Sequence, residues 1–211
     1  MERHRLAIVI PAWNESNTIA EVVRVASNYG IPIVVDDGSI DCTGEQARQV
    51  GAIVVIHQRN SGYDAALNSG FEKANAIGCR YVLTMDADGQ HDPGVIHKMI
   101  EALEQGADVV SGIRDRRQRI AEHAFAWMTS LRWGLKDPLC GLKAYRLDLY
   151  RELGYFDSYR SIGTELLLFA VRNQKKIVQI AVKTKDRIDS PRFGNRLKGN
   201  IKIFRAIILS L

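Results

Sequence analysis

The first half of this chain alternates short apolar runs with segments of helical length. The apolar runs are rich in Val, Ile, Leu and Tyr, which is typical of strands buried on both faces. They span residues 6–10, 31–35, 52–56, 81–85 and 108–110. The helix-like segments between them span residues 18–27, 43–50, 63–76 and 93–105. This alternation predicts an α/β fold with a mostly parallel central sheet flanked by helices.

The second half of the chain is less regular. An arginine-rich segment at 114–119 predicts a loop, and a helix is expected to follow it to about residue 133. Further elements are expected as strands near 142–145 and 177–182, a helix over 164–173 and a terminal helix. A length of 211 residues suits one domain with a substantial core. We therefore expect a single domain over residues 1–211 whose two halves do different jobs.

Composition excludes several classes of protein. Apolar residues at 46% and charged residues at 25% exclude a disordered chain, and a net charge of +5 is too mild for a nucleic-acid-binding signature. Three cysteines without metal-ligand spacing favour a reducing, cytoplasmic compartment. No apolar stretch reaches the roughly 18 residues that span a bilayer. The apolar tail at 201–211 predicts either an amphipathic helix on a membrane surface or a docked terminal helix.

The strand expected at 81–85 ends in two acidic residues, Asp86 and Asp88. At the carboxyl edge of an α/β sheet, such a pair lies where ligands gather. Paired carboxylates prefer a hard cation such as Mg²⁺, which is often shared with substrate phosphates. The alternative is an acidic turn that opens the next helix, because Asp92 precedes Pro93 and Asp is a good helix N-cap.

Two neighbouring strands also end in polar and acidic residues. Asn14 and Glu15 follow the first strand, and Asp36 and Asp37 follow the second. A Gly-X-Gly-X-X-Gly fingerprint and a P-loop are both absent, which excludes the common dinucleotide and P-loop sites. Because parallel strand ends converge, these acids should line one cleft, where they repel one another unless a cation or donors intervene. The three strand ends together favour a nucleotide and metal site over simple turns.

Five motifs carry a resemblance to a known family. They are Pro-Ala-Trp-Asn-Glu at 11–15, Asp-Asp-Gly-Ser at 36–39, Asn-Ser-Gly at 60–62, Asp-Ala-Asp-Gly-Gln-His at 86–91 and Asp-Pro-Leu-Cys-Gly-Leu-Lys-Ala-Tyr-Arg at 137–146. As a set they resemble the family 2 glycosyltransferases of GT-A fold, with the nearest likeness to dolichyl-phosphate mannose synthase and other polyprenyl-phosphate glycosyltransferases. Tyr63-Asp64 departs from the usual Lys- or Gly-containing continuation, and Cys140 stands where the subgroup often has Ser.

The resemblance implies a nucleotide-sugar donor, GDP-mannose or a UDP-sugar, bound by the first half of the chain to about residue 112. The residues it assigns to the donor are Pro11, Ala12, Asn14, Glu15, Asp36, Asp37 and Asp86. It assigns Mg²⁺ or Mn²⁺ to Asp88 and Gln90 together with Asp86. The metal would stabilise the leaving nucleoside diphosphate as a Lewis acid. Transfer of the hexose would proceed with inversion, and the catalytic residues would be Asp86, Asp88, Arg114 and Asp137.

The resemblance assigns the acceptor, a polyprenyl or dolichyl phosphate, to residues 113–211. Its phosphate would be held by Arg114, Arg119, Arg187 and Ser190. The enzyme would then work at the cytoplasmic face of a membrane as a peripheral protein, with or without a membrane-protein partner. A hydroxyl acceptor in glycan synthesis is the alternative and needs a general base, for which Asp137 and Glu165 are candidates. A non-catalytic nucleotide-sugar-binding subunit is the third possibility.

Overall fold

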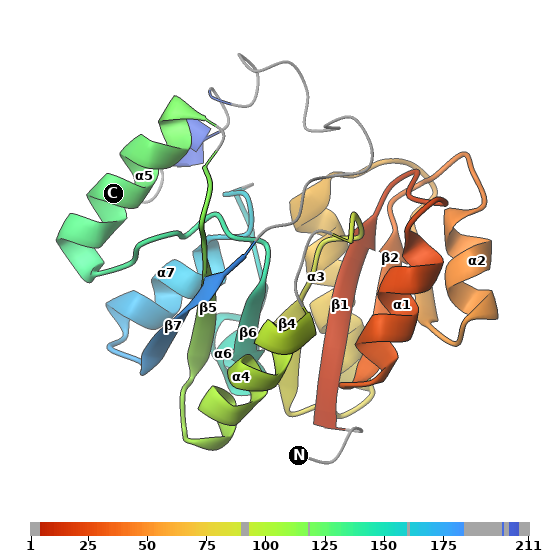
Figure 1. Ribbon diagram of the computed structural model, residues 1–211, viewed down its shortest axis with the longest axis horizontal. Coiled ribbons are helices and arrows are strands. Elements are labelled where there is room, and N and C mark those ends of the chain that lie inside the picture. Colours follow the sequence, from red (N-terminus) through yellow and green to blue (C-terminus); the bar gives the residue numbers. More distant parts are fainter. Residues whose placement is uncertain are drawn as a thin grey trace.

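The computed structural model describes residues 5–89, 93–117, 119–159, 161–183, 200 and 203–206. These residues form an α/β fold with one seven-stranded sheet (Figure 1). The strands are β1 (Leu6–Ala12), β2 (Ile31–Asp36), β3 (Ile53–Ile56), β4 (Tyr81–Thr84), β5 (Val109–Arg114), β6 (Lys143–Arg146) and β7 (Ile177–Val182). The helices are α1 (Ile19–Ser27), α2 (Thr43–Gln49), α3 (Tyr63–Ala76), α4 (Pro93–Glu104), α5 (Ile120–Trp133), α6 (Leu147–Leu153) and α7 (Glu165–Arg172). The predicted fold class is therefore confirmed.

The strand order is β3-β2-β1-β4-β6-β5-β7. Strand β1 pairs in parallel with β2 and β4, and β5 pairs in parallel with β7. Strand β6 is antiparallel to both of its neighbours, β4 and β5, so the sheet is mixed. This insertion places the segment just before β6 beside the carboxyl end of β4, where Asp86 and Asp88 follow. The sequence pattern predicted a strand near 142–145 but carried no sign of its direction.

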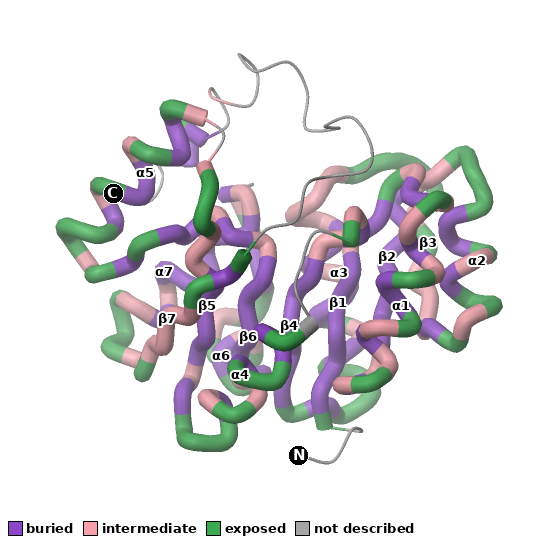
Figure 2. The backbone as a smooth tube through the Cα atoms, in the orientation of Figure 1, coloured by how far each residue is buried: buried purple, intermediate pink, exposed green. Residues whose placement is uncertain are grey.

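Helices cover both faces of the sheet, and each face has its own apolar cluster. Leu6, Ile8 and Ile10 of β1 point into the cluster under α1, α2 and α4, whereas Ala7 and Val9 point into the cluster under α3, α6 and α7. This alternation is the period of two that a strand imposes on its side chains. Figure 2 shows the inner strands of the sheet as the buried centre of the molecule, whereas the edge strands β3 and β7 are mostly only partly buried. Full burial of one such large apolar side chain contributes about 1.5–3 kcal/mol.

The described residues 203–206 pack onto α5. Ile203 and Ala206 are buried in a small third cluster with Ala121 and Phe125. This part of the predicted tail is therefore docked against the protein, while the remainder of residues 201–211 lies outside the described residues. Among the helices that the structure describes, none is long and apolar enough to cross a bilayer.

Candidate active site

The loops that follow β1 and β2 are tied to each other at the upper edge of the sheet in Figure 1. Asn14 has a φ of 54°, in the left-handed region that asparagine tolerates better than most residues. Its backbone N–H donates to Ser39 Oγ at 2.9 Å, and its side-chain Oδ1 accepts from the Ile40 N–H at 2.9 Å. The Glu15 N–H donates to Thr43 Oγ1 at 2.8 Å. Pro11 and Ala12 are the last residues of β1 and directly precede these hydrogen-bonded loops.

The two aspartates that end β2 are buried and have different partners. Asp36 Oδ1 accepts from the Ser39 N–H at 2.9 Å, which closes the turn after the strand. Asp37 accepts from the backbone N–H groups of Ser61 and Gly62 at 2.9 and 2.8 Å. Asp37 also lies 2.7 Å from Nδ1 of His57, whose Nε2 contacts Ser69 Oγ at 2.9 Å. Asp37 therefore holds the loop before α3. No local sequence pattern predicted this contact.

Asp86 and Asp88 lie at the same edge, where β4 gives way to a turn, and both are half-buried. The hydroxyl of Tyr63 is 3.5 Å from Asp86 Oδ1. Gly141 also lies against this carboxylate, because a Cβ atom on Gly141 would lie only 2.3 Å from Asp86 Oδ2. Thr18 Oγ1 of the α1 cap donates to the carbonyl of Ala87 at 2.7 Å, so the turn is also fixed to α1. The structure thus brings the three predicted strand ends together.

The carboxylates of this edge suit a metal ion that is also coordinated by a bound phosphate, rather than one coordinated by protein side chains alone. Within the described ranges, no three His, Cys, Asp or Glu side chains gather closely enough to hold a metal by themselves. Asp86 and Asp88 would therefore supply part of a coordination shell, which Mg²⁺ or Mn²⁺ commonly completes with phosphate oxygens and water. Gln90, the third predicted ligand, lies outside the described residues.

In the second half of the chain, Arg114 and Asp137 bind each other. Asp137 Oδ2 accepts from the backbone N–H and Nε of Arg114 at 3.0 and 2.9 Å, and Oδ1 accepts from Nη2 at 3.0 Å. Burial alone would raise the pKa of Asp137, but the hydrogen bonds and charge of Arg114 outweigh it and lower that pKa. Glu122 lies 3.4 Å from Arg114 Nη2 and 3.9 Å from Arg119 Nη1. Arg187 and Ser190, the other predicted acceptor ligands, lie outside the described residues.

The second candidate base, Glu165, is also engaged. Its carboxylate accepts from the backbone N–H of Ser158 at 2.6 Å and from the Ser158 hydroxyl at 3.0 Å. Lys143 is buried nearby and donates from Nζ to the carbonyl of Gly163 at 3.2 Å. Burial lowers the pKa of Lys143, while the charges of Cys140, Asp137 and Asp86 oppose that shift. Lys143 is the first residue of β6, and the sequence patterns did not predict its burial.

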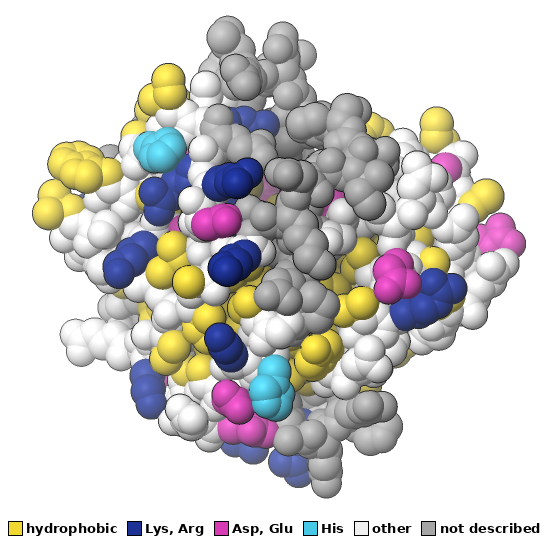
Figure 3. Space-filling model, viewed as in Figure 1, with side chains coloured by type: hydrophobic (Ala, Val, Ile, Leu, Met, Phe, Trp, Pro, Cys, Tyr) yellow, Lys and Arg dark blue, Asp and Glu magenta, His cyan; other side chains and the backbone are white. Residues whose placement is uncertain are grey.

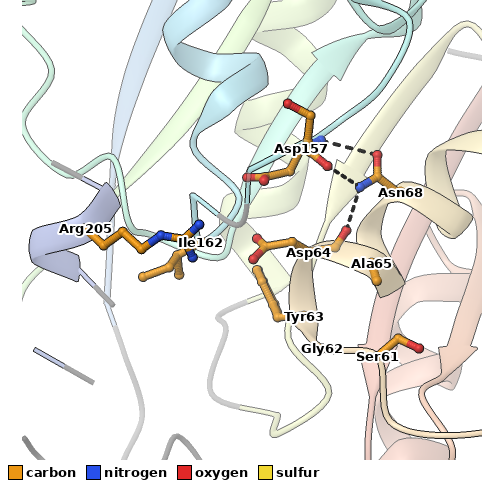
Figure 4. Close-up of a pocket in the computed structure, with 10 residues that line it drawn as sticks. Ser61, Gly62, Tyr63, Asp64, Ala65, Asn68, Asp157, Ile162 and Arg205 are labelled. Atoms are coloured by element: carbon orange, nitrogen blue, oxygen red, sulfur yellow. Dashed lines mark hydrogen bonds between the residues drawn. The ribbon is translucent and has the colours of Figure 1, made fainter. Parts of the chain in front are cut away.

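A cavity of about 340 Å³ opens beside the start of α3 (Figure 4). Its lining residues are mostly polar and come from three segments: Ser61, Gly62, Tyr63, Asp64, Ala65, Asn68, Asp157, Ser158, Ile162 and Arg205. Asp64 Oδ1 accepts from the Gly163 N–H at 2.7 Å. Burial and the charge of Asp157 raise the pKa of Asp64 to about 6. The sequence patterns did not predict this cavity, because its walls come from segments about 90 residues apart.

Comparison with known proteins shows which family this chain is similar to. Residues 7–155 match the family described as glycosyl transferase family 2. An uncharacterized protein of Methanocaldococcus jannaschii is 30% identical over 201 residues, covering 87% of this chain and 83% of that protein. An undecaprenyl-phosphate 4-deoxy-4-formamido-L-arabinose transferase of Pseudomonas fluorescens is 32% identical over 164 residues. That match covers 68% of this chain and 47% of the transferase, so the chain spans about half of its relative's length.

Solved structures show the same fold at lower identity. Glucosyl-3-phosphoglycerate synthase from Mycobacterium tuberculosis, in complex with Mn²⁺ and UDP-glucose, superposes with a TM-score of 0.78 at 22% identity. The match covers 99% of this chain and 79% of that one. At this identity the likeness establishes the fold alone.

Proposed function

Because the chain belongs to glycosyltransferase family 2 and is thus an enzyme that transfers a sugar from a nucleotide sugar, we propose that its acceptor is a polyprenyl phosphate. In this proposal the transfer inverts the anomeric centre, depends on Mg²⁺ or Mn²⁺, and moves a hexose from GDP-mannose or a UDP-sugar. The observation that carries the metal-dependent part is the convergence of Asp86 and Asp88 with the braced loops after β1 and β2.

The donor would lie along the carboxyl edge of β1, β2 and β4. Asn14, Glu15, Asp36 and Asp37 are held in that edge by the hydrogen bonds between its loops. Pro11 and Ala12 form the end of β1 beneath them. Polar and acidic groups fixed in this way suit ribose hydroxyls and base N–H groups. A nucleoside would therefore meet a preorganised surface rather than a loop that must first be ordered.

Asp88, with Gln90 and Asp86, would hold the metal ion against the donor diphosphate. When bound, the metal supplies Lewis-acid stabilisation of the departing nucleoside diphosphate. A donor set of two carboxylates and phosphate oxygens suits this role, because both metals favour oxygen ligands. The mycobacterial synthase of the same fold is described in complex with Mn²⁺ and UDP-glucose, which supports the choice of metal and of donor class.

The state of the candidate bases favours a phosphate acceptor over a hydroxyl acceptor. Asp137 is bound by Arg114 and its pKa is lowered, so it is a weak proton acceptor at neutral pH. Glu165 is already bound to Ser158. A lipid monophosphate has a second pKa of about 6 and is therefore largely ionised without help. It needs orientation, which arginine guanidinium groups provide.

Arginines of the second half would give that orientation. Asp137 occupies Nε and Nη2 of Arg114, so a phosphate would meet the Nη1 edge of this guanidinium. Arg119, with Arg187 and Ser190, would complete the phosphate site. On the face shown in Figure 3, Lys and Arg side chains gather over the half that holds α5, β5 and β7. A basic face of this kind favours peripheral attachment to an anionic membrane surface.

A hydroxyl acceptor is the second candidate. The mycobacterial synthase, with the same fold, is described in complex with phosphoglyceric acid, a small phosphorylated hydroxy acid. The polar cavity beside α3 gives such a molecule a place to bind.

One transfer assay distinguishes the two acceptor classes. The protein is incubated with radiolabelled GDP-mannose or UDP-glucose, Mn²⁺, and either a short polyprenyl phosphate or 3-phosphoglycerate. We expect labelled lipid in the organic phase with one donor, and none with Asp88→Ala. Label that appears only on the hydroxy acid would refute the polyprenyl phosphate acceptor and support a hydroxyl acceptor. Label on neither acceptor, with donor binding intact, would favour a non-catalytic subunit.

A further inference from the structure

The carboxylate of Asp86 contacts two residues that come from distant parts of the chain. Tyr63, the first residue of α3, contacts Oδ1, and Gly141, just before β6, lies so close that a Cβ atom there would clash with both carboxylate oxygens. We propose that Tyr63 and Gly141 are positioning residues that hold the Asp86 carboxylate in one orientation toward the donor. The inference rests on the proposed function, in which Asp86 meets the sugar nucleotide.

Tyr63 supplies a directional contact to this carboxylate. Its hydroxyl lies 3.5 Å from Asp86 Oδ1. A tyrosine hydroxyl is protonated at neutral pH, so it can donate to the Asp86 carboxylate. A distance of 3.5 Å exceeds the roughly 2.5–3.0 Å usual for an O–H···O bond. The contact is thus at the weak end of its range, which sets the size of the expected effect.

Gly141 packs directly against the carboxylate. A Cβ atom there would lie 2.3 Å from Asp86 Oδ2 and 2.7 Å from both Cγ and Oδ1 of Asp86, distances that no unshifted side chain reaches. Gly141 itself is held by β4, because Thr84 Oγ1 donates to the Gly141 carbonyl at 2.6 Å. The Lys143 N–H in turn donates to Thr84 Oγ1 at 3.3 Å. The segment that touches Asp86 is thereby fixed to the strand that carries it.

The backbone at Tyr63 is anchored by the next residue, and the Tyr63 side chain also lines the cavity beside α3. The next residue, Asp64, anchors the start of α3 by accepting from the Gly163 N–H. Tyr63 lines the cavity of Figure 4, in which Arg205 reaches in from the side opposite α3. A molecule in the cavity would therefore contact the residue whose hydroxyl touches Asp86.

A double-mutant cycle tests the role of Tyr63. Binding of GDP-mannose or UDP-glucose with Mn²⁺, whichever binds the wild type, is measured by calorimetry for Tyr63→Phe, Asp86→Asn and the double variant. Loss of one weak hydrogen bond to a carboxylate should raise Kd by about five-fold in Tyr63→Phe. In the Asp86→Asn background the same change should alter Kd by less than about two-fold, because the hydroxyl then meets a neutral amide instead of a charged carboxylate. Tyr150→Phe is the control that loses a hydroxyl elsewhere.

The nucleoside monophosphate provides the second readout. UMP or GMP reaches only the part of the site formed by β1 and β2, so Tyr63→Phe should leave its affinity unchanged. Additive losses in the cycle, or equal losses for the monophosphate and the nucleotide sugar, would overturn the positioning role. A wild-type protein that binds neither nucleotide sugar would overturn the proposed function, and this inference with it.

Gly141→Ala tests the packing of Gly141 against the carboxylate. Its matched control is Gly70→Ala, because a Cβ on Gly70 would lie 2.2 Å from Val9 Cγ1, an equally close contact that does not involve Asp86. Both variants should be destabilised. Only Gly141→Ala should lower kcat per folded molecule, by more than about ten-fold, or 1.4 kcal/mol in the barrier. Equal kcat values for the two variants would contradict the role of Gly141.

Discussion

Replacing Arg114 with alanine should destabilise the protein far more than removing an ordinary surface arginine. The Asp137 side chain is 2% exposed and that of Arg114 is 19% exposed. Two side-chain hydrogen bonds at 2.9 and 3.0 Å join them. The alanine variant would leave the Asp137 carboxylate buried with only the backbone N–H of residue 114 as a known donor.

The magnitude follows from the geometry of this pair. Breaking a buried ion pair by removing one partner costs about 3–5 kcal/mol, because the remaining charge is uncompensated. Arg114 is partly exposed, so water offsets some of that cost and a loss of about 3 kcal/mol is expected. For a chain of this length, such a loss lowers the melting temperature by roughly 10 °C. Asp137→Asn in the Arg114→Ala background should restore part of the loss by removing the buried charge.

Urea denaturation followed by circular dichroism at pH 7 measures this difference, with Arg24→Ala as the control. Arg24 pairs with Glu21 at 3.5 Å, but both side chains are more than half exposed, so its loss should change stability by less than about 0.5 kcal/mol. Because the pKa of Asp137 is lowered in the folded state, the stabilisation is present above its ordinary pKa of 3.8. It is lost as the pH falls below that value. Equal midpoints for the two alanine variants would refute this reasoning.

Three further predictions follow from single contacts. Asp64 has a raised pKa of about 6, so its ionisation opposes folding at neutral pH by up to about 3 kcal/mol. The wild type should gain stability relative to Asp64→Asn as the pH falls from 7.5 to 5, and parallel stability curves would contradict this. Asp37→Ala should release the Ser61–Gly62 loop and weaken donor binding by at least about ten-fold, since the N–H groups of Ser61 and Gly62 and the His57 ring lose their partner; unchanged calorimetric affinity would argue against that link. Arg119→Ala should raise the KM for polyprenyl phosphate by about ten-fold while leaving the donor KM within two-fold, and matched changes in both would point to a structural role.

The first half of the fold could be predicted from the sequence because its signals are local. An apolar run followed by a helix-like segment defines a strand and its crossover without information from elsewhere. The acidic ends of β1, β2 and β4 follow from the same pattern, because parallel strands carry their carboxyl ends to one edge. The positions of Asp36, Asp37, Asp86 and Asp88 at this edge were predicted in this way. The residues that contact them were not predicted.

The second half depends on pairing between distant segments. Strand β6 lies antiparallel between β4 and β5, and no local pattern distinguishes that position from a place at the sheet's edge. The binding of Arg114 to Asp137 across 23 residues depends on that placement. So does the contact of Gly141 with Asp86. Helix α6 was missed because its seven residues follow β6 without a turn signal.

Calorimetric titration of the nucleotide sugar, with and without Mn²⁺, tests the metal-dependent donor site most directly. The wild-type protein should bind GDP-mannose or UDP-glucose at least about ten-fold more tightly with Mn²⁺, a difference of about 1.4 kcal/mol. Asp88→Ala should lose that difference while keeping the wild-type melting temperature. Binding that is equally tight with and without Mn²⁺, or an unchanged metal effect in Asp88→Ala, would contradict the account.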